Sequence, residues 1–210
     1  MKKKEIRRER NREEIAATHI STSWSFLLDQ VHFNAYWDNF LTPKECQNII
    51  RLGKKNLKIA SVGGKQPGVN LKTRKSKVSW VFPSQAEWLF RRLTDTILSL
   101  NKDFFGFELW GSIEGCQFTC YKQPDDHYRK HVDRMHNNIP RKLSFTVNLS
   151  DPKDYEGGEL WLDDSEEGLP VKKTQGTLYA FPSFLLHEVK PVTKGVRYSL
   201  VGWITGPSFK

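Results

Sequence analysis

The second half of this chain alternates apolar and polar residues with a period of two, which constrains its fold more than any other feature. That period indicates strands that bury one face. Besides the segment 143–149, short strands are expected at 159–162, 169–172, 177–181 and 196–205, and turns rich in Gly, Pro and Asp separate them. Many short strands of this kind favour a jelly roll or barrel over a layered α/β fold. The clearest alternation sets Leu143, Phe145, Val147 and Leu149 against Ser144, Thr146 and Asn148.

The first half of the chain carries two helix signals. Thr42 as N-cap, followed by Pro43 and then Glu45 at the third position, predicts the start of one helix. Ser84 with Glu87 predicts the cap of a second helix, after which apolar residues recur at helical spacing. We therefore expect a mainly β fold with flanking helices, in which a double-stranded β-helix (jelly roll) core is supported by N-terminal helices.

The length and composition suit one domain with a tail. A chain of 210 residues with 38% hydrophobic residues and seven Trp can bury a sizeable core. We expect a basic N-terminal tail or helix at 1–20 and a single domain at 21–210. Within that domain, 21–105 would form the support region and 106–210 the core that holds the site. The net charge of +9 would favour an acidic partner.

Cysteine usage and hydropathy bear on the compartment. Cys46, Cys116 and Cys120 are odd in number and scattered, which indicates reduced thiols rather than a disulfide framework. Cys116 and Cys120 would share one strand face and pack in the core. Neither a membrane-spanning apolar stretch nor a secretory signal is evident. The sequence thus predicts a cytoplasmic protein with no membrane partner.

A short motif and a distant histidine suggest a metal site. His131 and Asp133 are separated by one residue, so on a strand both side chains point to the same side. His187 would have to arrive from another strand. Two His and one carboxylate occupy one face of an octahedral Fe(II) and leave three positions open, whereas a structural zinc site is closed. These three residues therefore indicate an enzyme that activates oxygen.

Arg197 adds a second constraint, because it lies in the mostly apolar segment 196–204, which reads as a buried strand. A buried guanidinium needs an anionic partner. No Asp or Glu follows Glu188 in the chain, so the carboxylate of a bound ligand is a plausible partner, held in a two-pronged pair. Ser199 shares the strand face of Arg197 and could add a hydroxyl.

With these residues in place, the stretch 121–207 resembles the Fe(II)- and 2-oxoglutarate-dependent dioxygenases, in particular their prolyl 4-hydroxylase-like branch and its small microbial relatives. The order and spacing of several motifs together carry the likeness. They are His131-Val132-Asp133, the segments 141–145 and 148–152, Tyr155-Glu156-Gly157-Gly158-Glu159-Leu160, Phe181-Pro182-Ser183, and His187 through Gly195 to Arg197.

The resemblance implies roles for these residues. His131, Asp133 and His187 would bind the iron, and Arg197 would bind the distal carboxylate of 2-oxoglutarate. The family also places a Tyr upstream of the HxD motif on the same carboxylate, and Tyr121 is the nearest match. Fe(II), 2-oxoglutarate as cosubstrate and O2 would be required, with ascorbate as a further candidate cofactor. The reaction would hydroxylate a C–H bond and release succinate and CO2.

The substrate is left open by the sequence. A peptidyl prolyl or similar side chain of a protein or peptide is favoured, and a small molecule such as a free amino acid is a rival. The charge of +9 keeps a nucleic-acid demethylase or base hydroxylase in consideration. Related demethylases usually carry a second Arg six residues after the first, where this chain has Trp203. A noncatalytic jelly-roll module would have lost a metal ligand, and none is missing.

Loops and further histidines complete the candidates. Gly63 to Lys72 and Arg134 to Pro140 are the candidate loop segments for substrate selection. Within the first, Gly63 to Gly68 is either an ordinary connection or, as the resemblance implies, a mobile loop that covers the substrate. The acidic segment 163–168 reads as an exposed hairpin tip without a metal role. His19, His32, His127 and His136 are interpreted as residues outside the site. His136, in the loop after the HxD motif, is more simply a surface imidazole.

Overall fold

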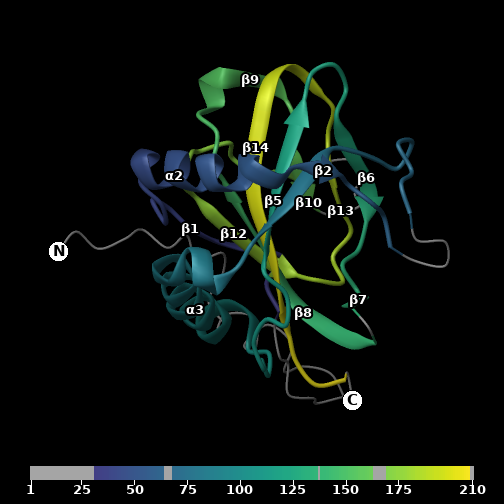
Figure 1. Ribbon diagram of the computed structural model, residues 1–210. Helices are drawn as coiled ribbons and strands as arrows, with labels where there is room; N and C mark the ends of the chain where they lie inside the picture. Colours follow the sequence, from purple (N-terminus) through teal and green to yellow (C-terminus); the bar gives the residue numbers. More distant parts are fainter. Residues whose placement is uncertain (1–30, 64–67, 137, 163–168, 209–210) are drawn as a thin grey trace, which may run out of the picture.

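The structure, a computed structural model, describes residues 31–63, 68–136, 138–162 and 169–208. Within these residues two antiparallel sheets dominate, so the prediction of a mainly β fold is confirmed (Figure 1). The larger sheet has nine strands: β1 (Ala35–Trp37), β2 (Lys58–Ile59), β4 (Lys77–Val81), β5 (Cys116–Lys122), β7 (Met135–His136), β8 (Ile139–Asn148), β9 (Tyr155–Gly157), β12 (Leu178–Pro182) and β14 (Val192–Thr205).

The smaller sheet lies across from the larger one and supplies much of the candidate site. Its five strands follow the order β11-β10-β13-β6-β3, and the path of the larger sheet runs β1-β12-β8-β14-β5-β4-β2. Strands distant in sequence become neighbours in this way, as in a jelly roll. The strands of the smaller sheet are β3 (Arg74–Lys75), β6 (His127–His131), β10 (Leu160–Leu162), β11 (Leu169–Pro170) and β13 (His187–Val189).

Two helices lie against the larger sheet, on the side away from β6, β10 and β13 (Figure 1). α2 (Pro43–Gly53) begins with the expected capping box, in which the Thr42 hydroxyl accepts from the backbone N–H of Glu45 and the Glu45 carboxylate accepts from the N–H of Thr42. α3 (Glu87–Leu100) is held to α2 by Arg92, whose guanidinium lies 2.8 Å from the Glu45 carboxylate. Short helical turns span Lys54–Asn56, Pro83–Gln85, Asn101–Phe105 and Pro152–Asp154.

The start of α3 differs from the prediction. Ser84 does not cap the helix; the residue at the N-cap is Ala86, which makes no side-chain cap hydrogen bond. Ser84 instead lies in the separate turn Pro83–Gln85, which the Gln85 side chain closes by accepting from the backbone N–H of Phe82 at 2.9 Å. The prediction that Ser84 and Glu87 cap the second helix is therefore wrong, because the turn that contains Ser84 ends before α3 begins.

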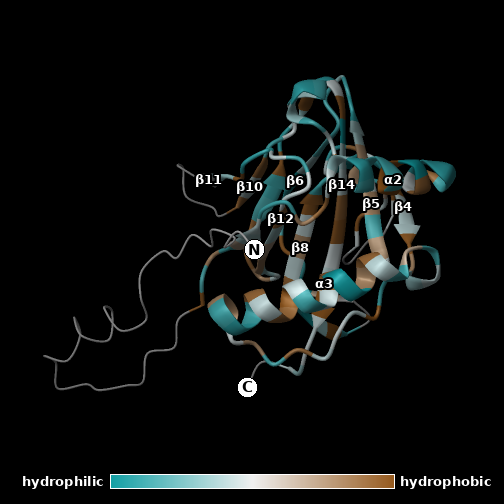
Figure 2. Ribbon diagram, turned by 90° about the vertical axis from the view of Figure 1, so that its left-hand side faces the viewer, coloured by the Kyte–Doolittle hydropathy of each residue, from teal (hydrophilic) through white to brown (hydrophobic). Residues whose placement is uncertain are grey.

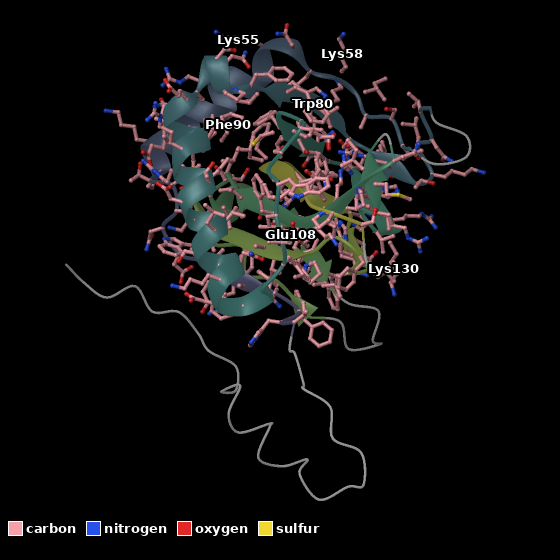
Figure 3. The ribbon with its side chains drawn as sticks, turned by 90° about the horizontal axis from the view of Figure 1, so that it is seen from below. Lys55, Lys58, Trp80, Phe90, Glu108 and Lys130 are labelled. Carbon is pink, nitrogen blue, oxygen red and sulfur yellow. The ribbon has the colours of Figure 1, made fainter. Side chains whose placement is uncertain are left out.

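The apolar residues form two clusters on the two sides of the larger sheet. The main cluster joins α2 and α3 to the outer face, where Phe90 packs from α3 toward the sheet (Figure 3). Along α3, hydrophobic and hydrophilic stretches alternate, as expected of a helix with one buried side (Figure 2). The second cluster fills part of the space between the two sheets, with Tyr121, Leu160, Leu162, Phe181, Leu185, Val189 and Val192.

The alternation along the central strands sorts residues between these two regions. Cys116 and Cys120 of β5 are buried in the main cluster, as expected, and both are free thiols. The intervening Gln117 and Thr119 face the space between the sheets and line a pocket there. Gly202 of β14 lies so close to Phe145 of β8 that an added Cβ would approach the ring to 2.3 Å. The sheet therefore separates the main apolar cluster from a pocket that polar side chains of β5 help to line.

Several expectations concern residues outside those that the structure describes. These are the tail at 1–20, His19, part of the loop 63–72 and the acidic tip at 163–168. Among the described residues, no helix combines the length and apolar character needed to cross a membrane. In the first half of the chain, β1 covers only Ala35–Trp37, and β3 and β4 are separated at Ser76.

Candidate active site

His131, Asp133 and His187 meet between the two sheets. His131 ends β6 and His187 begins β13, and the antiparallel pairing sets these two residues opposite each other. Asp133 follows β6 by two residues, just beyond the end of the strand, and its backbone N–H donates to the carbonyl of Ser183 at 2.8 Å. One ligand atom from each of the three residues lies within 4.8 Å of the others, the single group of this kind among the residues described.

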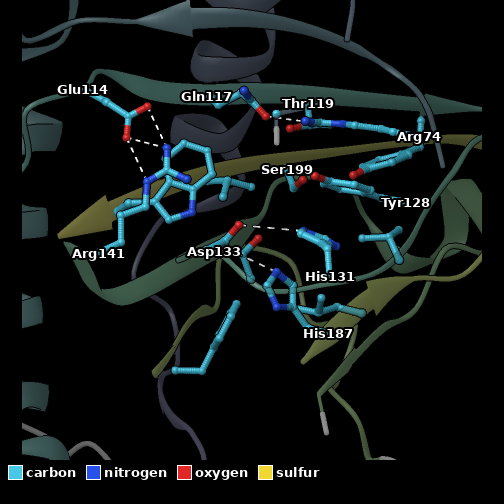
Figure 4. Close-up of a pocket in the computed structure, with 18 of the residues that line it drawn as sticks. Arg74, Glu114, Gln117, Thr119, Tyr128, His131, Asp133, Arg141, His187 and Ser199 are labelled. Carbon is cyan, nitrogen blue, oxygen red and sulfur yellow. Dashed lines mark hydrogen bonds and ion pairs between the residues drawn. The ribbon is translucent and has the colours of Figure 1, made fainter. Parts of the chain in front are cut away.

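The shorter contacts within this group join the imidazoles to the carboxylate. His187 Nε2 lies 3.4 Å from Asp133 Oδ2, and His131 Nε2 lies 3.8 Å from Asp133 Oδ1 (Figure 4). These spacings leave both Nε2 atoms and the carboxylate facing a common point. Two imidazole nitrogens and one carboxylate oxygen form the donor set that suits a ferrous ion with three open positions.

Contacts behind the three residues fix their orientation. His131 Nδ1 lies 2.8 Å from the carbonyl of Arg129, and His187 Nδ1 lies 2.9 Å from that of Leu185. A carbonyl only accepts, so each Nδ1 carries a proton, and in the neutral form of each imidazole Nε2 has a lone pair. The Ser144 hydroxyl donates to Asp133 Oδ2 at 2.9 Å. The site thus holds the tautomer and the carboxylate rotamer that metal binding requires.

The protonation states agree with this arrangement. Burial, together with the neighbouring His187, lowers the pKa of His131 to about 4, so its imidazole is neutral near pH 7. Burial alone would raise the pKa of Asp133, but the contact with His187 outweighs burial and holds that pKa below its usual range. Burial would lower the pKa of His187, but its hydrogen bond with Asp133 raises it, so with no metal bound Asp133 favours a proton on this imidazole. The carboxylate therefore remains charged although Asp133 is buried. A charged carboxylate beside a neutral imidazole is what a divalent cation needs.

A cavity of about 280 Å³ opens beside the three residues. Its walls come from both sheets, as residues of β5, β8 and β14 face residues of β6, β10 and β13 across it. Polar side chains gather at one wall, among them Gln117, Thr119, Thr146, Arg197 and Ser199. The cavity is thus a chamber with one polar wall, next to the three clustered residues.

Arg197 lies in β14 within this cavity and is 4% exposed. Its guanidinium donates to the Ser199 hydroxyl at 3.3 Å and lies 5.6 Å from the centre of the Tyr121 ring, directly across the β14–β5 pairing. The structure therefore brings together all three residues expected at the 2-oxoglutarate carboxylate. No Asp or Glu of the described part of the chain forms an ion pair with Arg197; nearby Glu159 pairs with Lys173 at 2.6 Å.

The Gly-Gly motif makes room for this arginine. Gly158 has φ +64°, a backbone conformation that favours glycine, and an added Cβ would lie 3.1 Å from Arg197 Cδ and 2.8 Å from Val192 Cγ2. A side chain at this position would collide with the stem of the guanidinium. The motif at 157–160 therefore shapes the wall of the pocket around Arg197.

A second arginine, Arg141, lies at the other end of the cavity and is already neutralised. Its guanidinium forms a two-pronged pair with Glu114, with nitrogen–oxygen distances of 2.6 and 2.8 Å. It also stacks over the Trp203 ring at 3.9 Å from the ring centre. This pair closes one side of the pocket (Figure 4). Glu114 and Arg141 are distant in sequence and meet only in the folded chain, so the sequence did not predict this ion pair.

The other histidines described lie outside the pocket. His127 begins β6, but its ring contacts the backbone carbonyls of Asp125 and Lys72. His32 packs edge-on against Phe104. Sequence reasoning missed Tyr128, which stacks on His131, and Arg74, which lies over the Tyr128 ring. The sequence did not single out Arg74, because several other basic residues lie close to it in the chain.

Residues 116–205 match a family model described as the 2OG-Fe(II) oxygenase superfamily. This region is therefore similar to that superfamily. It contains the three clustered residues and Arg197, so the family match and the geometry select the same part of the chain.

Further similarity is found to curated relatives called PKHD-type hydroxylases. One from Prochlorococcus marinus is 45% identical over 99 residues, 47% of this chain and 44% of the relative. Another, from Idiomarina loihiensis, is 39% identical over 83 residues, 39% of this chain and 38% of the relative. The aligned regions thus span less than half of these relatives.

Solved structures extend the likeness in fold over more of this chain. A prolyl-4-hydroxylase from Pseudomonas putida gives a TM-score of 0.65 at 23% identity, covering 84% of this chain and 94% of that one. A prolyl hydroxylase from Trichoplax adhaerens, solved with a hypoxia inducible factor peptide fragment, gives 0.65 at 20% identity, covering 82% and 83%. These neighbours confirm the jelly-roll core and its prolyl 4-hydroxylase-like fold.

Proposed function

We propose that this protein is an Fe(II)- and 2-oxoglutarate-dependent dioxygenase that hydroxylates a C–H bond of a peptidyl prolyl or similar side chain. The observation that carries the proposal is the convergence of His131, Asp133 and His187 beside a cavity that also contains Arg197. When bound, Fe(II) with 2-oxoglutarate and O2 supplies the oxidation that hydroxylates substrate and releases succinate and CO2.

The three clustered residues fit the iron. In the neutral imidazoles both Nε2 atoms have a lone pair, because each Nδ1–H is engaged with a backbone carbonyl, and Asp133 is held by Ser144. His131, Asp133 and His187 would therefore bind the metal with little rearrangement. Because they occupy one side of the common point, the opposite side is left to the cavity.

Arg197 fits the distal carboxylate of 2-oxoglutarate. Its buried guanidinium has one neutral hydroxyl as its hydrogen-bond partner among the described residues, so a carboxylate entering the cavity would gain a charge-assisted pair. Ser199 would add a hydroxyl to the same group. Tyr121, also buried and directly opposite on β5, would border it. All three residues would bind and orient the cosubstrate.

The peptidyl substrate is supported by similarity alone. The relatives that match in sequence are named PKHD-type hydroxylases, and the structural neighbours include a prolyl hydroxylase solved with a peptide fragment. A small-molecule hydroxylase has the same site chemistry and is an outcome of the test below. A nucleic-acid demethylase is disfavoured because Trp203 stands where those enzymes place a second Arg.

The test is to incubate the protein with Fe(II), 2-oxoglutarate and O2 and to measure succinate, then to search a proline-containing peptide library and a set of free amino acids for a gain of one oxygen by mass spectrometry. We expect succinate formation that Asp133→Ala abolishes, with Asp95→Ala on the exposed side of α3 as the matched control. Oxygen gained by free amino acids alone would reassign the substrate class. Succinate formation unaffected by Asp133→Ala would refute the iron site.

A further inference from the structure

A second buried guanidinium in the cavity has no assigned role. Arg74 of β3 lines the same cavity as Arg197 and is 7% exposed. Burying a charge is costly unless an opposite charge compensates it. Since Arg74 lies in the smaller sheet and Arg197 in the larger one, the two cations enter the cavity from opposite walls. The cavity therefore contains more positive charge than one cosubstrate carboxylate would neutralise.

The partners of Arg74 are all neutral. Its Nε donates to the Ser76 hydroxyl at 3.0 Å, its Nη2 donates to Gln117 Oε1 at 2.7 Å, and the guanidinium lies 4.5 Å above the centre of the Tyr128 ring. A guanidinium has five N–H donors, so three are unused by the described residues. No carboxylate in the described part of the chain pairs with it, in contrast to Arg141, which has Glu114.

The position of Arg74 is tied to the metal-binding face through one aromatic ring. Arg74 pairs with Tyr128 across the β3–β6 register, which places the guanidinium over the Tyr128 ring. That ring stacks on the His131 imidazole with centroids 3.5 Å apart. Strand pairing and stacking thus hold the cation at a set distance from the proposed iron ligand (Figure 4).

The hydroxyl of Thr119 has no hydrogen-bond partner among the residues described and lies on the same wall of the cavity as Gln117, which accepts from Arg74. Thr119 is 1% exposed and lines the cavity. It is two residues from Gln117 on β5, so both side chains face the cavity. Figure 4 shows Gln117, Thr119 and the end of the Arg74 side chain together. A free hydroxyl beside unused N–H donors forms a site for an anionic oxygen.

We infer that Arg74 and Thr119 bind a carboxylate of the peptidyl substrate, close to the hydroxylated C–H bond. The inference rests on the proposed function, in which 2-oxoglutarate occupies Arg197 and the iron and so leaves Arg74 to the substrate. A carboxylate matches the planar guanidinium in a two-pronged pair, and the Thr119 hydroxyl can donate to it. The carboxylate has two sources in a peptide, an acidic side chain or the free C-terminus.

The experiment compares matched peptides that the wild-type protein hydroxylates. One arm replaces each Glu with Gln, and another amidates the C-terminus, so that the two sources of carboxylate are distinguished. We expect the carboxylate-bearing member of at least one pair to gain oxygen at least tenfold faster and to bind more tightly by fluorescence anisotropy. Arg74→Gln should remove this preference and Arg74→Lys should restore part of it, while Arg91→Gln, on the exposed side of α3, should retain it.

Three outcomes would overturn the inference. In the first, the wild type shows no preference in either arm, or no carboxylate-bearing peptide gains oxygen although succinate forms. In the second, Arg74→Gln keeps the preference. In the third, Arg74→Gln raises the 2-oxoglutarate requirement of the peptide-free reaction as much as Arg197→Met does, which would assign Arg74 to the cosubstrate. Succinate formation by the wild type, with and without peptide, is a separate readout, and its absence under both conditions would refute the proposed function instead.

Discussion

Replacing Arg197 with Met would remove the guanidinium that is proposed to hold 2-oxoglutarate while keeping a side chain of similar length. A hydrogen bond to a charged group contributes roughly 1.5–3 kcal/mol, so the loss of a two-pronged pair should cost about 3–4 kcal/mol. Since about 1.4 kcal/mol corresponds to a factor of ten, the 2-oxoglutarate concentration at half-maximal succinate formation should rise roughly 100- to 1,000-fold. The structural reason is that Arg197 is buried and lacks a carboxylate partner among the described residues.

The same substitution should leave the fold intact. Met removes a buried charge that no described carboxylate neutralises, so the free energy of unfolding in urea should be unchanged or increased. Arg92→Met is the matched control, because Arg92 pairs with Glu45 away from the cavity and should leave the 2-oxoglutarate requirement as in the wild type. An unaltered requirement in a folded Arg197→Met protein would refute the assignment and show that another residue holds the carboxylate.

Two further predictions concern stability and are checked by urea unfolding. Arg92 lowers the pKa of Glu45 from its ordinary 4.5 to about 2, so this carboxylate stabilises the fold above pH 4.5 and loses that effect as the pH falls toward 2. Because Arg92 is 41% exposed, Glu45→Gln should lower the free energy of unfolding by only about 1 kcal/mol at pH 7, and the difference should vanish near pH 2; a difference independent of pH would contradict this. Gly202→Ala would place a Cβ 2.3 Å from the Phe145 ring and should cost about 1–3 kcal/mol, whereas Gly63→Ala, which meets no atom within 4 Å, should cost much less.

Features that depend on local sequence were predicted well. The capping box of α2 involves only Thr42, Pro43 and Glu45, and the structure forms it as expected. The alternation along β8 depends only on the period of the strand, and its apolar residues Leu143, Phe145 and Val147 all join the main cluster. Such patterns succeed because neighbours in the chain determine them.

Features that depend on distant contacts were missed or wrong. Ser84 and Glu87 have the spacing of a cap, but the Gln85 side chain closes a separate turn before α3 begins. Arg74 lies among Lys72, Lys75 and Lys77, and only the pairing of β3 with β6 and the approach of β5 bury it. A sequence pattern does not contain these approaches, so it gave no reason to separate Arg74 from its basic neighbours.

The candidate metal ligands are an intermediate case. His131 and Asp133 were expected to share a strand face, whereas Asp133 lies just beyond the end of β6 and is placed by its backbone bond to Ser183. His187 is far from His131 and Asp133 in the sequence, so it was expected to come from another strand. The pairing of β13 with β6 that brings it opposite His131 is a property of the sheet topology. Their role as iron ligands is still a proposal.

The measurement that tests this proposal most directly is anaerobic equilibrium dialysis of the protein against Fe(II), with the bound metal determined by mass spectrometry. The account predicts one Fe(II) per chain for the wild type, a loss of binding in His187→Ala, and retention in His127→Ala, whose ring contacts backbone carbonyls outside the pocket. Undiminished Fe(II) binding by His187→Ala would contradict it, because the metal would then be held elsewhere.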